Sequence, residues 1–341
     1  MHVSVIIPAY NAEETIKETI HSVLAQTYQN LELIVVNDGS TDNTLEMLQK
    51  IDDKRLKIHS IENRGLPAAR NFGLSVAIGK YISFIDADDL WIADKLDKQL
   101  RALEREPDAG IAYSWTVLID SEGRFVGASD RLYLKGSVFK EMLLGCFLYS
   151  GSNALFRKDC IKSVGLFDQD KRSAADWDFL IRCSAAWNFV VVPNYQVFYR
   201  VRKDSMSSRI DEVEKDLLMV TEEAFRNAPV EYQPLKNKSL SLAYQYITSL
   251  YLTRRPEGDW KEQARVKLEK SLRIWPPIFW TSIALYNLIT LMFLHLPPYS
   301  LSSRMLTILQ EFKRGLMISF IPELSELYAI NRKSPYAKVT L

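Results

Sequence analysis

An alternation of strand and helix patterns over the first 115 residues limits the fold of this chain more than any other feature. Short β-branched and aliphatic runs, typical of buried strands, are separated by apolar residues at helical spacing. Because strands that alternate with helices form right-handed βαβ units, we predict an α/β fold with a mostly parallel sheet flanked by helices. The predicted strands are residues 3–7, 31–36, 56–59, 81–85 and 111–115.

The rest of the chain follows other patterns. Residues 116–207 mix short strands and helices, and from about Ile210 apolar residues recur at helical spacing. A length of 341 residues suits about two domains. We therefore predict a first domain of residues 1–207, with halves 1–115 and 116–207, and a helical C-terminal region of residues 208–341.

Charge and cysteine content exclude several classes of protein. The net charge is +1, so no global field favours nucleic acid and an anionic ligand needs a local site. The three cysteines are scattered and the first strand begins without a leader, which predicts a cytoplasmic protein without a signal peptide. The four histidines form no pair at metal-ligand spacing, so a zinc site is not expected.

Residues 274–303 carry no charged side chain, and Pro-Pro pairs at 276–277 and 297–298 flank the most apolar part. One interpretation is a buried helix of the helical region. The alternative is an interfacial or single-span membrane anchor, because Trp and Tyr residues and basic side chains are typical of membrane boundaries. Those residues are Trp275, Trp280, Tyr286, Arg273, Arg304, Lys313 and Arg314.

Three carboxylates lie within four residues at Asp86, Asp88 and Asp89, directly after the strand pattern of residues 81–85. Carboxylates this close repel one another, and a hard divalent cation such as Mg²⁺ or Mn²⁺ removes the repulsion. An exposed turn with a helix cap is the other interpretation. Ligands of parallel sheets bind beyond the carboxyl ends of strands, which favours a site here and at Asp38.

Four further residues have both a structural and a functional interpretation. Asp38 is either part of a strand-to-helix turn or part of a binding site, and the ring of Tyr10 either packs against the protein or stacks on a base. Arg70 is either a surface residue or the partner of Asp38 or of a phosphate. Asp176 is either the N-cap of a helix or a general base.

Four ordered sequence blocks carry a resemblance to a known family. Residues 1–205 of this chain resemble the family-2 glycosyltransferases with a GT-A fold, a Rossmann-like arrangement. The blocks are Val3–Asn11, Glu32–Asp42, Asn63–Gly73 and Ile85–Asp89.

The resemblance implies a role for each matching residue. Pro8, Tyr10, Asp38, Arg70 and Asp86 are then expected in the nucleotide site, where Tyr10 stacks on the base, Asp38 hydrogen-bonds it and Asp86 contacts the ribose. Residues 1–115 become the nucleotide half and residues 116–207 the acceptor half. Asp88 is expected to bind the cation with Asp89 beside it, and Asp176 to be the catalytic base.

Two positions depart from the family pattern. Ala175 replaces the first acid of the usual Glu-Asp pair. Arg202 stands where many relatives have a histidine that is taken as a metal ligand. We therefore expect a cation held chiefly by Asp88, with Arg202 as support for the diphosphate or the metal site.

The expected function is that of an inverting, metal-dependent, hexosyltransferase-type glycosyltransferase. Its expected partners are a nucleotide-sugar, with a UDP-sugar favoured, and a glycan or lipid-linked acceptor, in cell-surface polysaccharide or glycolipid synthesis at the cytoplasmic face of a membrane. The alternative is a non-catalytic nucleotide-sugar-binding module. A nucleotidyltransferase needs a Gly-rich phosphate loop, and a processive synthase needs several spanning helices and a Gln-x-x-Arg-Trp block; we find none of these.

Overall fold

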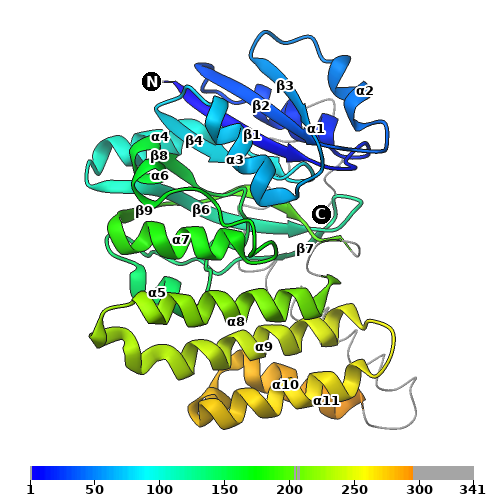
Figure 1. The fold of residues 1–341 in the computed structure, drawn as a ribbon, viewed down its shortest axis with the longest axis vertical. Helices are drawn as coiled ribbons and strands as arrows, with labels where there is room; N and C mark the ends of the chain where they lie inside the picture. The colour runs from blue at the N-terminus through cyan, green and yellow to red at the C-terminus, as the bar shows by residue number, and fades with distance from the viewer. Residues whose placement is uncertain (1, 203–204, 206–207, 295–341) are drawn as a thin grey trace. The chain divides into compact units, whose positions relative to one another are not determined.

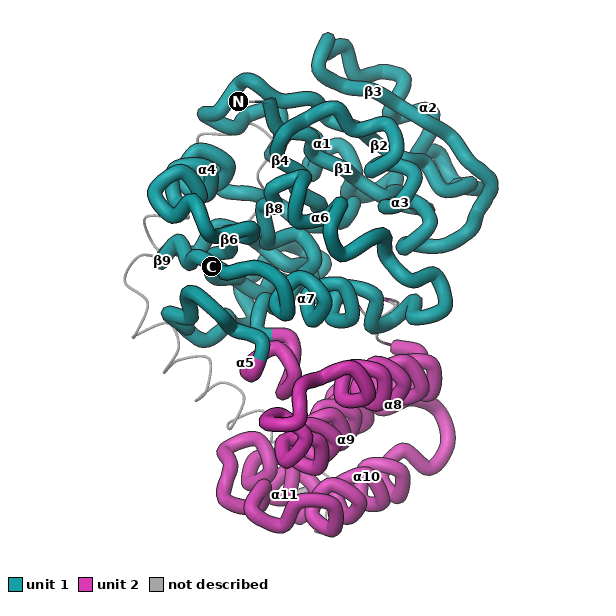
Figure 2. The backbone as a smooth tube through the Cα atoms, turned by 60° about the vertical axis from the view of Figure 1, so that its left-hand side comes forward, with its two compact units in different colours: residues 1–139, 147–201, 323–341 teal, residues 140–146, 202–322 magenta. Residues whose placement is uncertain are grey.

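The chain forms two compact units, which Figure 2 shows in different colours. A computed structural model describes residues 2–202, 205 and 208–294. Within these residues the first unit comprises 2–139 and 147–201, and the second comprises 140–146 and 202–294. Each unit is described separately below.

The first half of the first unit is a parallel sheet with helices between its strands (Figure 1). Its strands lie side by side in the order β3-β2-β1-β4, as alternating βαβ units require. The strands are β1 (Val3–Ala9), β2 (Leu31–Asp38), β3 (Leu56–Ile61) and β4 (Tyr81–Phe84). The helices are α1 (Ile16–Leu24), α2 (Thr44–Gln49) and α3 (Leu66–Val76).

The second half of this unit continues the same sheet as a mixed one, in the order β4-β8-β6-β9-β5, with β7 paired to β6. Strand β8 runs antiparallel to both of its neighbours, whereas β6 and β9 are parallel. These strands are β5 (Leu90–Trp91), β6 (Ala109–Ile119), β7 (Phe125–Ala128), β8 (Leu155–Arg157) and β9 (Asn188–Arg200). The helices are α4 (Lys95–Arg105), α6 (Lys158–Val164) and α7 (Ala175–Ala186), whereas α5 (Phe139–Leu144) belongs to the second unit from residue 140 onward.

The direction of β8 decides which loops meet at the end of β4. Ser83 of β4 is paired with Leu155 of β8 in antiparallel register. The segment that enters β8, residues 150–154, therefore lies beside the segment that leaves β4, residues 85–89. The predicted α/β fold is confirmed, and this antiparallel strand is the feature that the alternation pattern did not predict.

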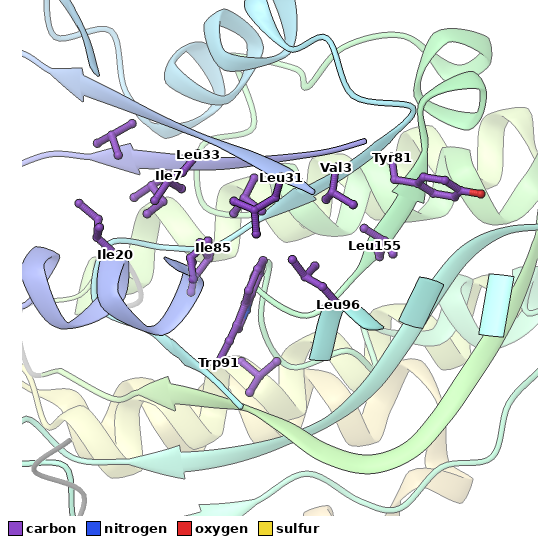
Figure 3. Packing of buried hydrophobic residues seen from close by; sticks show 14 of the residues in the cluster. Val3, Ile7, Ile20, Leu31, Leu33, Tyr81, Ile85, Trp91, Leu96 and Leu155 are labelled. Carbon is purple, nitrogen blue, oxygen red and sulfur yellow. The ribbon is translucent and has the colours of Figure 1, made fainter. Parts of the chain in front are cut away.

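Aliphatic side chains from β1, β2 and α1 form the core of this unit together with residues that follow β4. Ile7, Leu33 and Ile20 are each 1% exposed or less, and Trp91 and Leu96 extend the same cluster (Figure 3). Burial of such side chains stabilises a fold by roughly 1.5–3 kcal/mol each. This core fixes the positions at which β1, β2 and β4 end.

All five predicted strands are present, but the bounds of each differ from the prediction by one to four residues. Strand β1 continues past Pro8 to Ala9, although the sequence pattern predicted an end at residue 7. The carbonyl of Ile6 points toward β4, where it accepts a hydrogen bond from the amide of Ile85. The backbone nitrogen of Pro8, two residues further along β1, points to the same side, but β4 has already ended there at Phe84. Its missing N–H therefore costs no ladder bond. In addition, the short strands expected within residues 116–207 include one long strand, β9, of 13 residues.

The second unit is helical, as predicted for the residues up to 294. Ile247, Leu250, Leu268 and Leu291 belong to its core. No helix of the described segments is long and apolar enough to cross a membrane, and residues 295–303 of the predicted anchor lie outside them. The elements are α8 (Ile210–Asn227), the 3₁₀ helix η2 (Val230–Leu235), α9 (Lys236–Arg254), α10 (Trp260–Ile274), the 3₁₀ helix η3 (Pro276–Trp280) and α11 (Ser282–Leu294).

Candidate active site

The loops that follow β1 and β2 are hydrogen-bonded to each other. The amide of Asn11 donates to Ser40 Oγ at 3.1 Å, and the Thr41 amide donates to Asn11 Oδ1 at 2.8 Å. Tyr10, the first residue after β1, is 52% exposed. An exposed ring on a fixed loop is available for stacking against a flat ligand.

Asp38 ends β2 and organises the segment that leads into α3. Its two carboxylate oxygens accept hydrogen bonds from the amides of Arg64, at 2.9 Å, and Gly65, at 2.8 Å. Gly65 adopts φ +90°, a left-handed conformation that favours glycine. Asp38 therefore fixes the start of the helix that carries Arg70.

Arg70 joins two carboxylates that are far apart in the sequence. Its guanidinium is fully buried, with Nη2 2.7 Å from Asp86 Oδ1 and Nη1 hydrogen-bonded to Asp176 Oδ1. The rings of Phe84 and Phe167 lie beside it, with their centroids 5.8 and 5.4 Å from Cζ. Arg70 thus pairs with Asp86 and Asp176 rather than with Asp38, and brings the candidate base to the end of β4.

Asp176 lies in the first turn of α7, where no side chain caps the helix. Its carboxylate is 34% exposed, so it is paired with Arg70 but still accessible. Burial raises the pKa of Asp176, the charge of Arg70 opposes this rise, and the nearby negative charge of Asp86 adds to it. A carboxylate whose pKa is raised is a stronger base than an ordinary aspartate.

Asp89 has a different environment from its neighbours Asp86 and Asp88. Its side chain is fully buried and accepts hydrogen bonds from Ser150, Ser152 and the backbone amide of Arg200. Burial raises the pKa of Asp89 well above its usual range, and the charges of Asp88 and Asp86 raise it further. Asp86 and Asp88 are only partly buried.

No group of three or more His, Cys, Asp or Glu side chains in the described part of the chain is arranged to hold a metal ion. Asp88 is the partly exposed carboxylate of the cluster that is not paired with Arg70. Mg²⁺ and similar ions are commonly bound by one or two carboxylates together with substrate phosphates and water. The donor chemistry at Asp88 fits that kind of site.

Comparison with known proteins identifies the family of this chain. The family described as "Glycosyl transferase family 2" matches residues 4–165. An uncharacterised glycosyltransferase of Haemophilus influenzae is 50% identical over 218 residues, which cover 60% of this chain and 82% of that protein. The chain belongs to family 2 of the glycosyltransferases. The resemblance seen in the sequence is confirmed.

Two further similar proteins are also named glycosyltransferases. The Escherichia coli protein named UDP-Glc:alpha-D-GlcNAc-diphosphoundecaprenol beta-1,3-glucosyltransferase WfaP is 33% identical over 210 residues, 60% of this chain and 80% of that protein. A Rickettsia felis uncharacterised glycosyltransferase is 36% identical over 179 residues, 51% of this chain. This chain spans only 29% of the length of the Rickettsia relative.

Solved glycosyltransferase structures share the fold. The mannosyltransferase PcManGT from Pyrobaculum calidifontis, solved with GDP-Man and Mn²⁺, has a TM-score of 0.56 at 21% identity and covers 84% of each chain. S. aureus TarS 1–349 with UDP-GlcNAc has a TM-score of 0.53 at 18% identity, covering 81% of this chain and 89% of that one. These likenesses confirm the predicted GT-A fold.

Several residues around this candidate site were not assigned from sequence. Residues 150–152 lie beside the carboxylate cluster, where Ser150 and Ser152 donate hydrogen bonds to Asp89 and Gly151 adjoins Asp176. Arg200 donates hydrogen bonds to the Asp88 carbonyl through Nε and to Glu18 through Nη2, both at 2.9 Å. The only sequence signal of residues 150–152 is a Ser- and Gly-rich segment before an apolar run. Arg202 lies in the second unit, and its carbonyl accepts a hydrogen bond from Arg254. The support of the diphosphate by the Arg202 side chain stays a prediction.

Gly151 is predicted to be irreplaceable by alanine. A Cβ at this position would lie 2.6 Å from both Arg70 Nη2 and Asp176 Oδ2. Gly151→Ala should therefore displace the ion pair, lower the free energy of unfolding by about 1–3 kcal/mol and reduce activity more than tenfold. Thermal unfolding and a transfer assay measure these effects.

Gly127→Ala is the matched control. A Cβ there meets only side-chain atoms of Leu118, the nearer at 3.3 Å. Equal activity of the two variants would show that a Cβ at position 151 does not disturb the ion pair of Arg70 and Asp176.

Proposed function

We propose that the chain is an inverting, metal-dependent hexosyltransferase that moves a sugar from a nucleotide-diphosphate-sugar to an acceptor hydroxyl. The supporting observation is the buried Arg70, which pairs with Asp86 at the end of β4 and with Asp176, 106 positions from Arg70 in the sequence. The guanidinium of Arg70 thus binds both Asp86, which would contact the donor, and Asp176, which would be the base. This arrangement suits a reaction in which donor and acceptor meet at this point. One base carboxylate fits a single displacement.

Asp176 would accept the proton of the acceptor hydroxyl as its oxygen bonds to the anomeric carbon. The bond from that carbon to the diphosphate breaks, and its electron pair leaves with the diphosphate. Burial raises the pKa of Asp176 and so strengthens the carboxylate as a base, while the charge of Arg70 favours its ionised form. Tyr10, Asp38 and Asp86 would hold the base and ribose of the nucleotide.

Asp88 would hold the divalent cation, with phosphate oxygens and water as the other ligands. When bound, Mg²⁺ or Mn²⁺ would neutralise the charge that develops on the leaving diphosphate. Asp89 is fully buried and contacts Ser150 and Ser152, so a supporting role behind Asp88 suits it better than direct ligation.

A UDP-sugar and a lipid-linked acceptor are the favoured substrates. The support is the relative WfaP, whose name gives UDP-Glc as donor and a diphosphoundecaprenol-linked sugar as acceptor. On this basis we infer that the enzyme acts in the synthesis of cell-surface polysaccharide, at the cytoplasmic face of a membrane.

The proposal is tested by incubating the full chain with UDP-, GDP- and CMP-sugars, Mn²⁺ and a lipid-diphosphate-linked N-acetylhexosamine. Release of free nucleotide together with a glycosylated lipid of inverted anomeric configuration, assigned by NMR, is the expected result. Tight donor binding without any transfer or hydrolysis would favour the non-catalytic module instead.

One surface of the helical unit suits contact with the membrane that carries such an acceptor. The outward face of α11 is apolar: Leu285 is 38% exposed, Ile289 is 42% exposed and Met292 is 62% exposed. Trp280 in η3 is 81% exposed, and the preceding cation Arg273 has 82% of its side chain exposed. Tryptophan and arginine beside an apolar stripe are typical of helices that lie in the membrane interface.

The double variant Trp280→Ser, Met292→Ser is expected to lower binding to phosphatidylglycerol vesicles at least about tenfold, because two large apolar side chains leave the contact. Co-sedimentation of the full chain measures this. Val230→Ser removes another exposed apolar residue, 85% exposed in η2, and should have no effect. Wild-type binding by the double variant would refute this contact surface.

A further inference from the structure

The segment that enters β8 contacts the carboxylate loop of residues 86–89 through one hydroxyl. Ser152 Oγ accepts a hydrogen bond from the Asp86 amide at 2.9 Å and donates one to Asp89 Oδ2 at 2.6 Å. The hydroxyl therefore joins the first and last residues of the loop. Ser152 is fully buried, so water cannot replace either bond in the folded chain.

Asp89 receives two further hydrogen bonds that fix its carboxylate. Ser150 Oγ donates to Oδ2 at 3.0 Å, and the Arg200 amide donates to Oδ1 at 2.9 Å. The Asp89 amide also donates to the Asp86 carbonyl at 3.1 Å, which closes the loop on itself. The partly exposed side chains of Asp86 and Asp88 are thus carried by a backbone that Asp89 holds from inside.

The segment that carries Ser152 is itself held from behind by three side chains. Trp91 Nε1 donates to the Ser152 carbonyl at 2.8 Å, and Gln99 Nε2 donates to the Asn153 carbonyl at 3.0 Å. Ser83 Oγ donates to the Ala154 carbonyl at 2.7 Å. Three successive carbonyls are therefore bound by buried groups, so Ser152 cannot shift without breaking them.

We propose that Ser152 is a positioning residue, which orients the Asp86 and Asp88 carboxylates toward the nucleotide-diphosphate by holding both ends of their loop. Its effect on the nucleotide rests on the function proposed above. Ser152 does not touch the substrate; it acts through Asp86 and Asp89. Partners of this kind, which orient a ligating carboxylate, typically change metal affinity when they are removed.

Ser150→Ala is the matched control for Ser152→Ala. Both variants remove a hydroxyl that donates to Asp89 Oδ2, but only Ser152 also bonds to the Asp86 amide. Ser152→Cys keeps the shape of the side chain with a somewhat larger atom and replaces the hydroxyl with a weak donor and acceptor, so it should give an intermediate result.

The first measurement is hydrogen exchange, followed by mass spectrometry, of peptides that cover residues 85–89 in the full chain without ligand. Ser152→Ala should exchange faster in these peptides than the wild type and Ser150→Ala, because the Asp86 amide has lost its acceptor. Unchanged exchange would show that Ser152 does not hold the loop. This outcome does not depend on what the site binds.

The second measurement is calorimetry of UDP with Mn²⁺. Ser152→Ala should bind about tenfold or more weakly than the wild type, Ser152→Cys should lie between them, and Ser150→Ala should lose less. Wild-type affinity in Ser152→Ala would overturn the positioning role. If the wild type itself fails to bind any nucleotide, the proposed function is wrong, while the exchange experiment still decides whether Ser152 holds the loop.

Discussion

Replacing Asp176 with asparagine is expected to reduce sugar transfer by a factor of about 10² to 10⁴, the usual contribution of a general base. Asparagine can still accept a hydrogen bond from Arg70, so the variant should keep the local arrangement and bind UDP with Mn²⁺ like the wild type. Initial rates with saturating donor and acceptor measure the loss. Calorimetry with UDP shows whether the nucleotide site is intact.

Asp178→Asn is the control for this prediction. Asp178 lies in the same turn of α7, but it pairs with Lys171 at 2.7 Å and Arg182 at 2.8 Å instead of Arg70. Its replacement should lower the unfolding temperature and leave the transfer rate per folded molecule unchanged. A normal turnover rate in Asp176→Asn would show that another group accepts the proton.

Asp88→Ala is expected to remove the metal dependence of donor binding. Loss of a direct ligand should weaken Mn²⁺-dependent UDP binding by more than the about 10–100-fold that loss of an outer-shell partner costs. Titration of UDP with and without Mn²⁺ separates the metal effect from base and ribose contacts, which Tyr10 and Asp38 would still provide.

Asp94→Ala is the control for Asp88→Ala. Asp94 is a partly exposed aspartate nearby in the sequence, paired with Lys98 at 2.9 Å, and no site role is proposed for it. It should bind UDP with Mn²⁺ like the wild type. An unchanged response to Mn²⁺ in Asp88→Ala would mean that the cation, if one is used, is held elsewhere.

The sequence predicted those parts of the site that depend on where strands end. Asp38 and Asp86 follow strong apolar runs, and buried runs form strands whose ends are fixed by the core that they pack into. Because parallel strands end at one edge, both positions could be placed at the same edge before the structure was known. Their individual roles in binding stay predictions.

Contacts between distant segments could not be predicted in the same way. Nothing local distinguishes pairing of Arg70 with Asp38 from pairing with Asp86 and Asp176, since the choice depends on how α3 and α7 pack. The short strand β8 gives no sign of its antiparallel direction. That direction alone brings Ser152 to the carboxylate loop, so the loop's support was not predicted.

The apolar C-terminal stretch shows a third kind of limit. Its composition suited a buried helix or a membrane anchor equally, and α11 has one apolar face that is buried and another that is exposed. Ala284 and Leu291 are buried in the helical unit, while Ile289 and Met292 face outward. Composition alone cannot separate two faces that are both apolar, whereas the helix packing does.

The central claim is that the residues around Asp86 form a nucleotide-diphosphate site that requires a cation. The most direct test is calorimetry of the wild-type chain with UDP, GDP and CMP, each with Mn²⁺ and with EDTA. We predict that at least one nucleoside diphosphate, with UDP favoured, binds in Mn²⁺ and loses most of its affinity in EDTA. Equal affinity in Mn²⁺ and EDTA, or no binding of any nucleotide, would contradict the claim.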